Sequence, residues 1–139
     1  MIGIIEVYGS MLLRALGQTL LLTLLSLLFA MVIGMIFGLM NVGHNRVLNL
    51  IGTIYVDAVR GVPLIVLAYF IYFGVPAGMQ GLGFASFRLN ALQAGTAALS
   101  MNCGAYMAEI IRAGIESVDR GQMEAARSLG LSYSSSMAL

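Results

Sequence analysis

The feature that most constrains the fold is a long stretch without Asp, Glu, Lys or Arg, which lies between Arg14 and Arg46. A helix needs about 20 mostly apolar residues to cross a bilayer. The leucine-dense part of this stretch therefore predicts a membrane span at about residues 16–40. Charged residues make up only 9% of the chain, whereas soluble domains carry about a quarter. We therefore expect an all-α integral membrane protein.

Two later apolar runs predict further spans. The second is expected over about residues 61–76, because Gly61-Val62-Pro63 places a proline where the first turn of a helix tolerates it. The third, over about residues 90–114, is less apolar and richer in small residues. We predict one transmembrane domain over residues 1–139 with three spans.

The segments between the spans are predicted to be turns and short surface elements. Residues 41–60 begin with a polar, turn-forming cluster. They continue into a short helix that we expect at the membrane interface, and Asp57 and Arg60 near its end predict a weak surface ion pair. The glycine-rich residues 74–87 predict a loop.

Small or weakly polar residues recur every three or four positions along the first predicted span, and Gly34 and Gly38 belong to this stripe. Small side chains allow a second helix to approach closely. We interpret the stripe mainly as a packing surface. The alternative is that Gln18, Thr19 or Thr23 also lines a polar path.

The third predicted span carries a polar face. Asn102, Glu109, Arg112, Glu116 and Arg120 follow one another at helical spacings, so that the face continues beyond the span into the polar run. We interpret Glu109 and Arg112 as an ion pair within or between helices, and Asn102 as a buried packing hydrogen bond. The alternative is that this face lines the pathway of a substrate.

The arginines predict the orientation, because basic residues concentrate on the cytoplasmic side of membrane proteins. If the N-terminus lies outside, most arginines lie on the cytoplasmic side of the membrane. These are Arg46, Arg60, Arg112, Arg120 and Arg127, whereas Arg14 and Arg88 lie outside. We therefore expect a multi-pass protein whose N-terminus lies outside.

Several classes of function lack the residues they need. Cys103 and His44 are the only residues of their types, so a metal cluster or a nucleophile–histidine site has almost nothing to be built from. A net charge of +1 gives no electrostatic basis for binding nucleic acid. We expect no cofactor, no metal and no catalytic residue.

The one sustained polar run, residues 117–130, directly follows the third predicted span. Within it, Glu124-Ala125-Ala126 followed by Gly130 resembles the EAA signature of permease subunits of ATP-binding cassette (ABC) importers. Residues 105–118, the opening of the second span at residues 59–64, and the entry to the first span at residues 17–20 resemble the polar amino-acid branch of that family.

This resemblance implies a MetI-like permease fold in a bacterial-type cytoplasmic membrane. A second permease subunit, cytoplasmic ATP-binding subunits and an extracytoplasmic substrate-binding protein would complete the importer, and ATP would be hydrolysed on the partner chain. The segment 117–130 would dock on the ATP-binding subunit. Glu124 would offer it a charge, Ala125 and Ala126 would permit close approach, and Gly130 would end the helix in a left-handed conformation.

The resemblance also implies an Ile-x-Leu-Pro element and about two more spans after the signature, whereas this chain reaches Leu139. We therefore expect a truncated permease domain that lacks its C-terminal helices. The alternative is a small non-transporting membrane protein, such as an assembly or regulatory subunit with a cytoplasmic docking helix.

Overall fold

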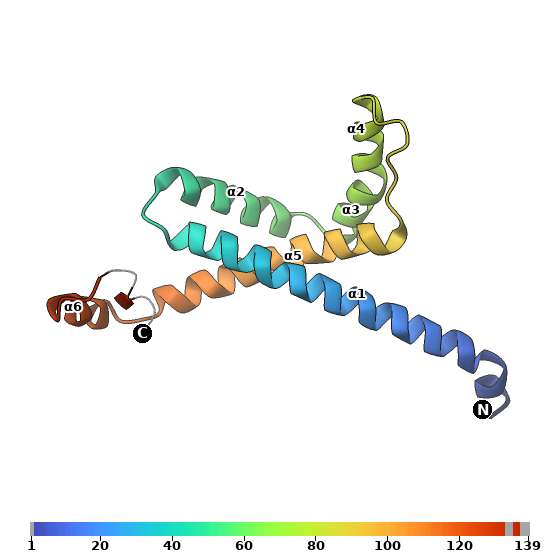
Figure 1. Cartoon of the computed structure of the whole chain (residues 1–139), viewed down its shortest axis with the longest axis horizontal. Helices are drawn as coiled ribbons and strands as arrows, with labels where there is room; N and C mark the ends of the chain where they lie inside the picture. Colours follow the sequence, from blue (N-terminus) through green and yellow to red (C-terminus); the bar gives the residue numbers. More distant parts are fainter. Residues whose placement is uncertain (1, 133–134, 137–139) are drawn as a thin grey trace.

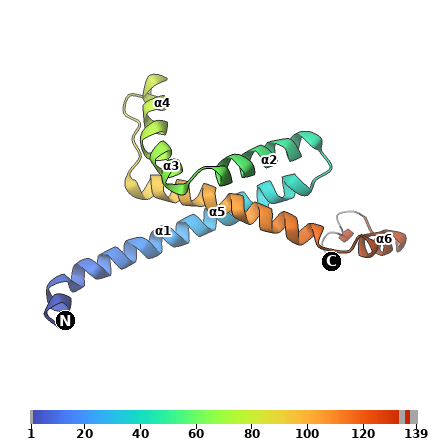
Figure 2. The same cartoon turned by 180° about the vertical axis from the view of Figure 1, so that it is seen from behind.

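The computed structural model describes residues 2–132 and 135–136, and this part of the chain contains helices and no strand. The elements are α1 (Ile2–Val42), α2 (Arg46–Gly61), α3 (Leu64–Tyr69), the π-helical turn η1 (Phe70–Gly74), α4 (Val75–Gly81), α5 (Ala91–Glu116) and α6 (Arg120–Ser128). α1 and α5 cross each other, and α2 folds back beside the C-terminal part of α1 (Figures 1 and 2). The α3–α4 arm stands at one end of α5, and α6 lies at the other.

Among the residues that the structure describes, two helical segments are long and apolar enough to cross a membrane: Tyr8–Val42, which lies in α1, and Leu64–Gly81, which joins α3, η1 and α4. The predicted span at 16–40 lies within the first of them. α5 has 26 residues and is therefore about 39 Å long at 1.5 Å per residue, which also suffices to span a bilayer. α5 is more polar than the other two segments, so its assignment as a third span stays a prediction.

The predicted end of the second span at Pro76 is wrong, as is the predicted loop over residues 74–87. The helix continues through Pro76 to Gly81, and only the residues between α4 and α5 form a loop. Proline removes one helical hydrogen bond and crowds the preceding turn. Here the turn before it is widened, so that the amide of Val75 donates to the carbonyl of Phe70, five residues back. Such a π-turn accommodates the proline without ending the helix.

The predicted packing stripe of α1 is confirmed as the surface that contacts α5. Ala30 is fully buried there, and so are Ala105 and Ala108 of α5. A Cβ atom added to Gly34 would lie only 2.6 Å from the Cβ atom of Met107. The two backbones therefore approach as closely as they do because a glycine stands at the crossing.

The stripe is buried only in the C-terminal half of α1. Thr19 and Thr23 are exposed, and their hydroxyls donate to carbonyls of their own helix, of Ala15 at 2.9 Å and of Thr19 at 2.8 Å. These hydroxyls are therefore satisfied without a polar path.

The predicted short helix of the connector is confirmed as α2. Asn45 caps its first turn by accepting from the amides of Val47 and Leu48. The ring of Tyr55 stacks on Phe37 of α1 with centroids 4.0 Å apart, and its hydroxyl donates to the carbonyl of Met101 in α5 at 2.8 Å. α2 therefore contacts both α1 and α5 through Tyr55.

Candidate functional site

The predicted docking segment contains a short helix, α6, with a defined start and end. The carboxylate of Asp119 accepts from the amide of Gly121 at 2.6 Å and so caps its first turn. At the other end Gly130 has a φ of +84°, and the amide of Leu131 donates to the carbonyl of Ala126 at 3.2 Å. This is a Schellman termination, so the predicted left-handed conformation of Gly130 is confirmed.

α6 presents its predicted contact residues to the surroundings. Glu124, Ala125 and Gly130 are exposed and Ala126 is half-buried. The helix lies beyond the end of α5 (Figure 1) and has no extensive contact with another described helix. The residues that the EAA resemblance singles out are therefore brought together on a helix that is open to a partner.

A line of charged side chains runs along the last three turns of α5. The guanidinium of Arg112 pairs with the carboxylate of Glu109 on one side and with the carboxylate of Glu116 on the other, at 2.7 Å. The predicted pair of Glu109 and Arg112 is confirmed. Because these side chains are about a third to a half exposed, the pairs contribute little to stability.

The predicted ion pair between Asp57 and Arg60 is wrong. Arg60 instead reaches α5, where its Nη1 atom lies 3.7 Å from Oε2 of Glu109 and its guanidinium carbon lies 5.3 Å from the centre of the Tyr106 ring. No ion pair of Asp57 is found in the described part of the chain. Sequence reasoning considered only partners on the same helix, and no local spacing could indicate a partner 49 residues away.

The charged groups border a polar hollow of about 320 Å³, which is lined by Asn41, Asn49, Thr53, Val56, Asp57, Arg60, Glu109, Arg112 and Glu116. It lies where α1, α2 and α5 meet. Water can enter a cavity of this size and polarity. The ion pairs are therefore hydrated rather than sealed in a core.

Other polar residues of α5 have local roles. Asn90 and Gln93 form a reciprocal capping box, with hydrogen bonds of 2.8 and 3.0 Å, that starts the helix. The predicted packing hydrogen bond of Asn102 is not found: its side chain is half-buried and has no hydrogen-bond partner among the residues described. The Asn-x-x-Gln spacing was a signal in the sequence that could have identified the cap.

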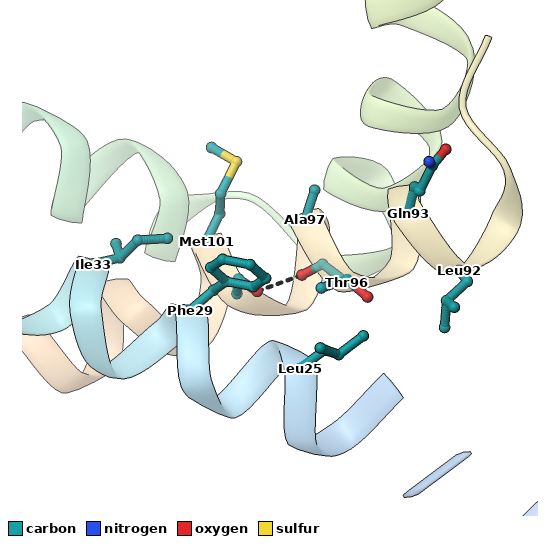
Figure 3. Close-up of a pocket in the computed structure, with 9 residues that line it drawn as sticks. Leu25, Phe29, Ile33, Leu92, Gln93, Thr96, Ala97 and Met101 are labelled. Carbon is teal, nitrogen blue, oxygen red and sulfur yellow. Dashed lines mark hydrogen bonds between the residues drawn. The ribbon is translucent and has the colours of Figure 1, made fainter. Parts of the chain in front are cut away.

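A second hollow, of about 460 Å³, lies between α1 and α5 (Figure 3). It is lined by Leu25, Phe29 and Ile33 from α1 and by Ala97 and Met101 from α5, among others. The hydroxyl of Ser100 at its wall has one proton to donate and two carbonyl acceptors within reach, that of Thr96 at 2.5 Å and that of Ser26 at 3.3 Å. Its lining is mostly apolar and contains no charged residue.

Comparisons with known proteins place these features in context. A family model described as "binding-protein-dependent transport system inner membrane component" matches residues 30–138. The probable glutamine ABC transporter permease protein GlnM of Bacillus subtilis is 41% identical over 92% of this chain and 56% of its own length. The arginine transport system permease protein ArtQ of the same organism is 36% identical over 91% and 55%.

A solved structure gives the same result for the fold. The crystal structure of an amino acid ABC transporter with histidines matches 96% of this chain and 59% of its own chain, at a TM-score of 0.81 and 37% identity. The chain therefore spans a little over half the length of these relatives.

Proposed function

Because the chain belongs to the family of binding-protein-dependent transport system inner membrane components, we propose that it acts as the transmembrane permease subunit, or part of it, of an ATP-driven importer. Polar amino acids are the proposed substrate class. Two of the similar permeases are named for glutamine and arginine, which supports a polar amino acid without identifying which one.

The observation that carries the proposal is the geometry of α6. A helix of nine residues is capped at both ends and exposed, and it holds Glu124, Ala125 and Ala126 clear of the helices that precede it. A short exposed helix with a cap at each end is suited to enter a cleft on another protein. We propose that this cleft lies on the cytoplasmic ATP-binding subunit.

In this mechanism the chain moves substrate but catalyses no reaction, and ATP is hydrolysed on the partner. Closure of the ATP-binding subunits would displace α6 as a rigid body, and α5 would carry the displacement into the membrane. A partner can shift a conformational equilibrium only through contacts that differ between the two states. The α6 contact would supply that difference between inward-facing and outward-facing states.

The remaining partners are proposed from the family. A second permease subunit, identical or related, would complete the pathway, and an extracytoplasmic binding protein would deliver the substrate. The arginine distribution supports an N-terminus outside and α6 in the cytoplasm. Asn102, Glu109 and Arg112 are proposed as the polar face of α5 that borders the pathway or the bundle interior.

The docking role is tested by co-purification with the ATP-binding subunit of the same importer. Glu124→Lys and Gly130→Asp should each abolish co-purification while membrane insertion is retained, because the first reverses the offered charge and the second disfavours the left-handed helix end. Asp57→Lys is the matched control, since it makes the same kind of charge change at an exposed site on α2. Undiminished recovery of the ATP-binding subunit with both α6 variants would refute docking.

The orientation is tested with a single introduced thiol. Cys103 is the only native cysteine, so Cys103→Ser combined with Ser128→Cys leaves one reactive group, on α6. A membrane-impermeant maleimide should label it in inverted vesicles and not in intact cells. Labelling in intact cells would contradict the proposed topology.

A further inference from the structure

Arg60 holds α2 against α5 directly beside the first break in the helical path between them, which lies between α2 and α3. α2 ends at Gly61, and the next two residues are extended, with φ and ψ of −102° and 130° for Val62 and −56° and 136° for Pro63. Proline imposes an extended conformation on the residue before it. α2 and α3 are therefore separate rigid elements joined by a two-residue hinge, and Arg60 lies directly beside that hinge.

The contact partners of Arg60 are one helical turn apart on α5. Tyr106 offers the face of its ring, 5.3 Å from the guanidinium carbon, and Glu109 offers a carboxylate oxygen 3.7 Å from Nη1. Residues three apart lie on the same side of a helix. A single side chain of α2 thus engages one face of α5 through two different interactions.

These interactions are exposed enough to be reversible. The side chains of Arg60 and Glu109 are 38% and 31% exposed, and both border the hydrated hollow of about 320 Å³. Exposed ion pairs and exposed cation–π contacts are individually weak, and ion pairs are screened by salt. Glu109 also keeps a second partner, Arg112, so its carboxylate stays paired when Arg60 leaves.

From this arrangement we infer that Arg60 is a positioning residue that latches α2 reversibly onto α5 through Glu109 and Tyr106. Release of the latch frees the end of α2 beside Val62 and Pro63, while Tyr55 still bonds α2 to Met101 of α5, so that α2 pivots on α5 about that contact. The charged line then continues from Glu109 through Arg112 to Glu116, the last residue of α5, which connects the latch to the helix that precedes α6. The inference concerns this chain alone and goes beyond the proposed function.

The test measures the distance between spin labels on α2 and α5 in lipid nanodiscs without any partner protein. In a Cys103→Ser background, labels are attached at Leu50→Cys and Ile110→Cys, two residues that are 60% and 70% exposed. In the parent at low salt we expect one dominant distance. Arg60→Gln should raise the ratio of released to latched molecules about three- to tenfold, the bias expected of two weak contacts. In 1 M salt the screening length is about 3 Å, so the ratio of released to latched molecules should also rise in the parent.

Two further variants separate a latch from a fixed structural contact. Arg46→Gln removes the same charge from the exposed start of α2, and its distribution of distances should match that of the parent. Glu109→Gln combined with Arg60→Gln should shift the distances no further than Arg60→Gln alone, because Arg60→Gln already removes both contacts of the latch. An unchanged distribution in Arg60→Gln would overturn the latch, and so would a parent distribution that does not respond to salt. Because no ATP-binding subunit is present, a failed co-purification experiment leaves this result unaffected.

Discussion

The crossing of α1 and α5 gives the sharpest test of how this fold is held together. In Gly34→Ala the new Cβ atom would lie 2.6 Å from the Cβ atom of Met107, and backbone atoms of Gly104 and Ala108 follow at 3.3 Å. Carbon atoms prefer separations of about 3.5–4.0 Å. The helices must therefore separate by about 1 Å, since no flexible side-chain end can move aside instead.

The expected cost is that of overpacking, about 1–3 kcal/mol. Gly17→Ala is the matched control, because Gly17 lies on the same helix with nothing within 4 Å of its added Cβ atom. Both substitutions change intrinsic helix propensity by the same amount. The difference between the two variants therefore isolates the contact at the crossing.

The assay is the rate at which a buried thiol at the crossing reacts with a maleimide. Ser26 is only 5% exposed and its hydroxyl has no hydrogen-bond partner in the described structure, so Ser26→Cys in a Cys103→Ser background is a mild probe. Separation of α1 and α5 exposes this thiol. At about 1.4 kcal/mol for each factor of ten, Gly34→Ala should label roughly 5- to 150-fold faster than Gly17→Ala. Rates that agree within about twofold would refute the argument that the glycine sets the approach of the two helices.

Two further predictions concern single hydrogen bonds. Tyr55→Phe keeps the ring stack on Phe37 but removes the hydrogen bond to the carbonyl of Met101. Losing that bond should lower the stability of α2 by about 1 kcal/mol, so that amide exchange in α2 becomes about fivefold faster. Tyr69→Phe, which removes an exposed hydroxyl, is the control and should leave amide exchange in α2 unchanged. Burial raises the pKa of Tyr55 from 10.0 to about 12, so the stability it contributes should be complete below pH 10 and lost as the pH rises toward 12. Asp119→Ala removes the cap at the start of α6. It should speed amide exchange in α6 by a factor that corresponds to about 1 kcal/mol. Unchanged exchange in α6 would show that the cap does not stabilise this helix.

Local sequence signals predicted most of the helical elements. The charge-free stretch predicted α1, and the glycine stripe predicted the surface with which α1 contacts α5, because small residues at helical spacing have few other uses in a membrane helix. The same reasoning failed at Pro76. A proline usually ends a helix, and the sequence does not show that the turn before it can widen.

In the candidate site, too, features that depend on adjacent residues were predicted, and contacts between helices were not. A helix within residues 117–130 and the left-handed Gly130 at its end were predicted from the sequence, because helix ends depend on a few adjacent residues. The partners of Arg60 did not, because Tyr106 and Glu109 become its neighbours only after α2 folds back on α5. The sequence by itself determined that this chain is helical and apolar and that a polar, charged run follows its last long helix. Only the tertiary structure decided which charges meet, because ion pairs between helices depend on how the helices pack and leave no periodic signal along the chain.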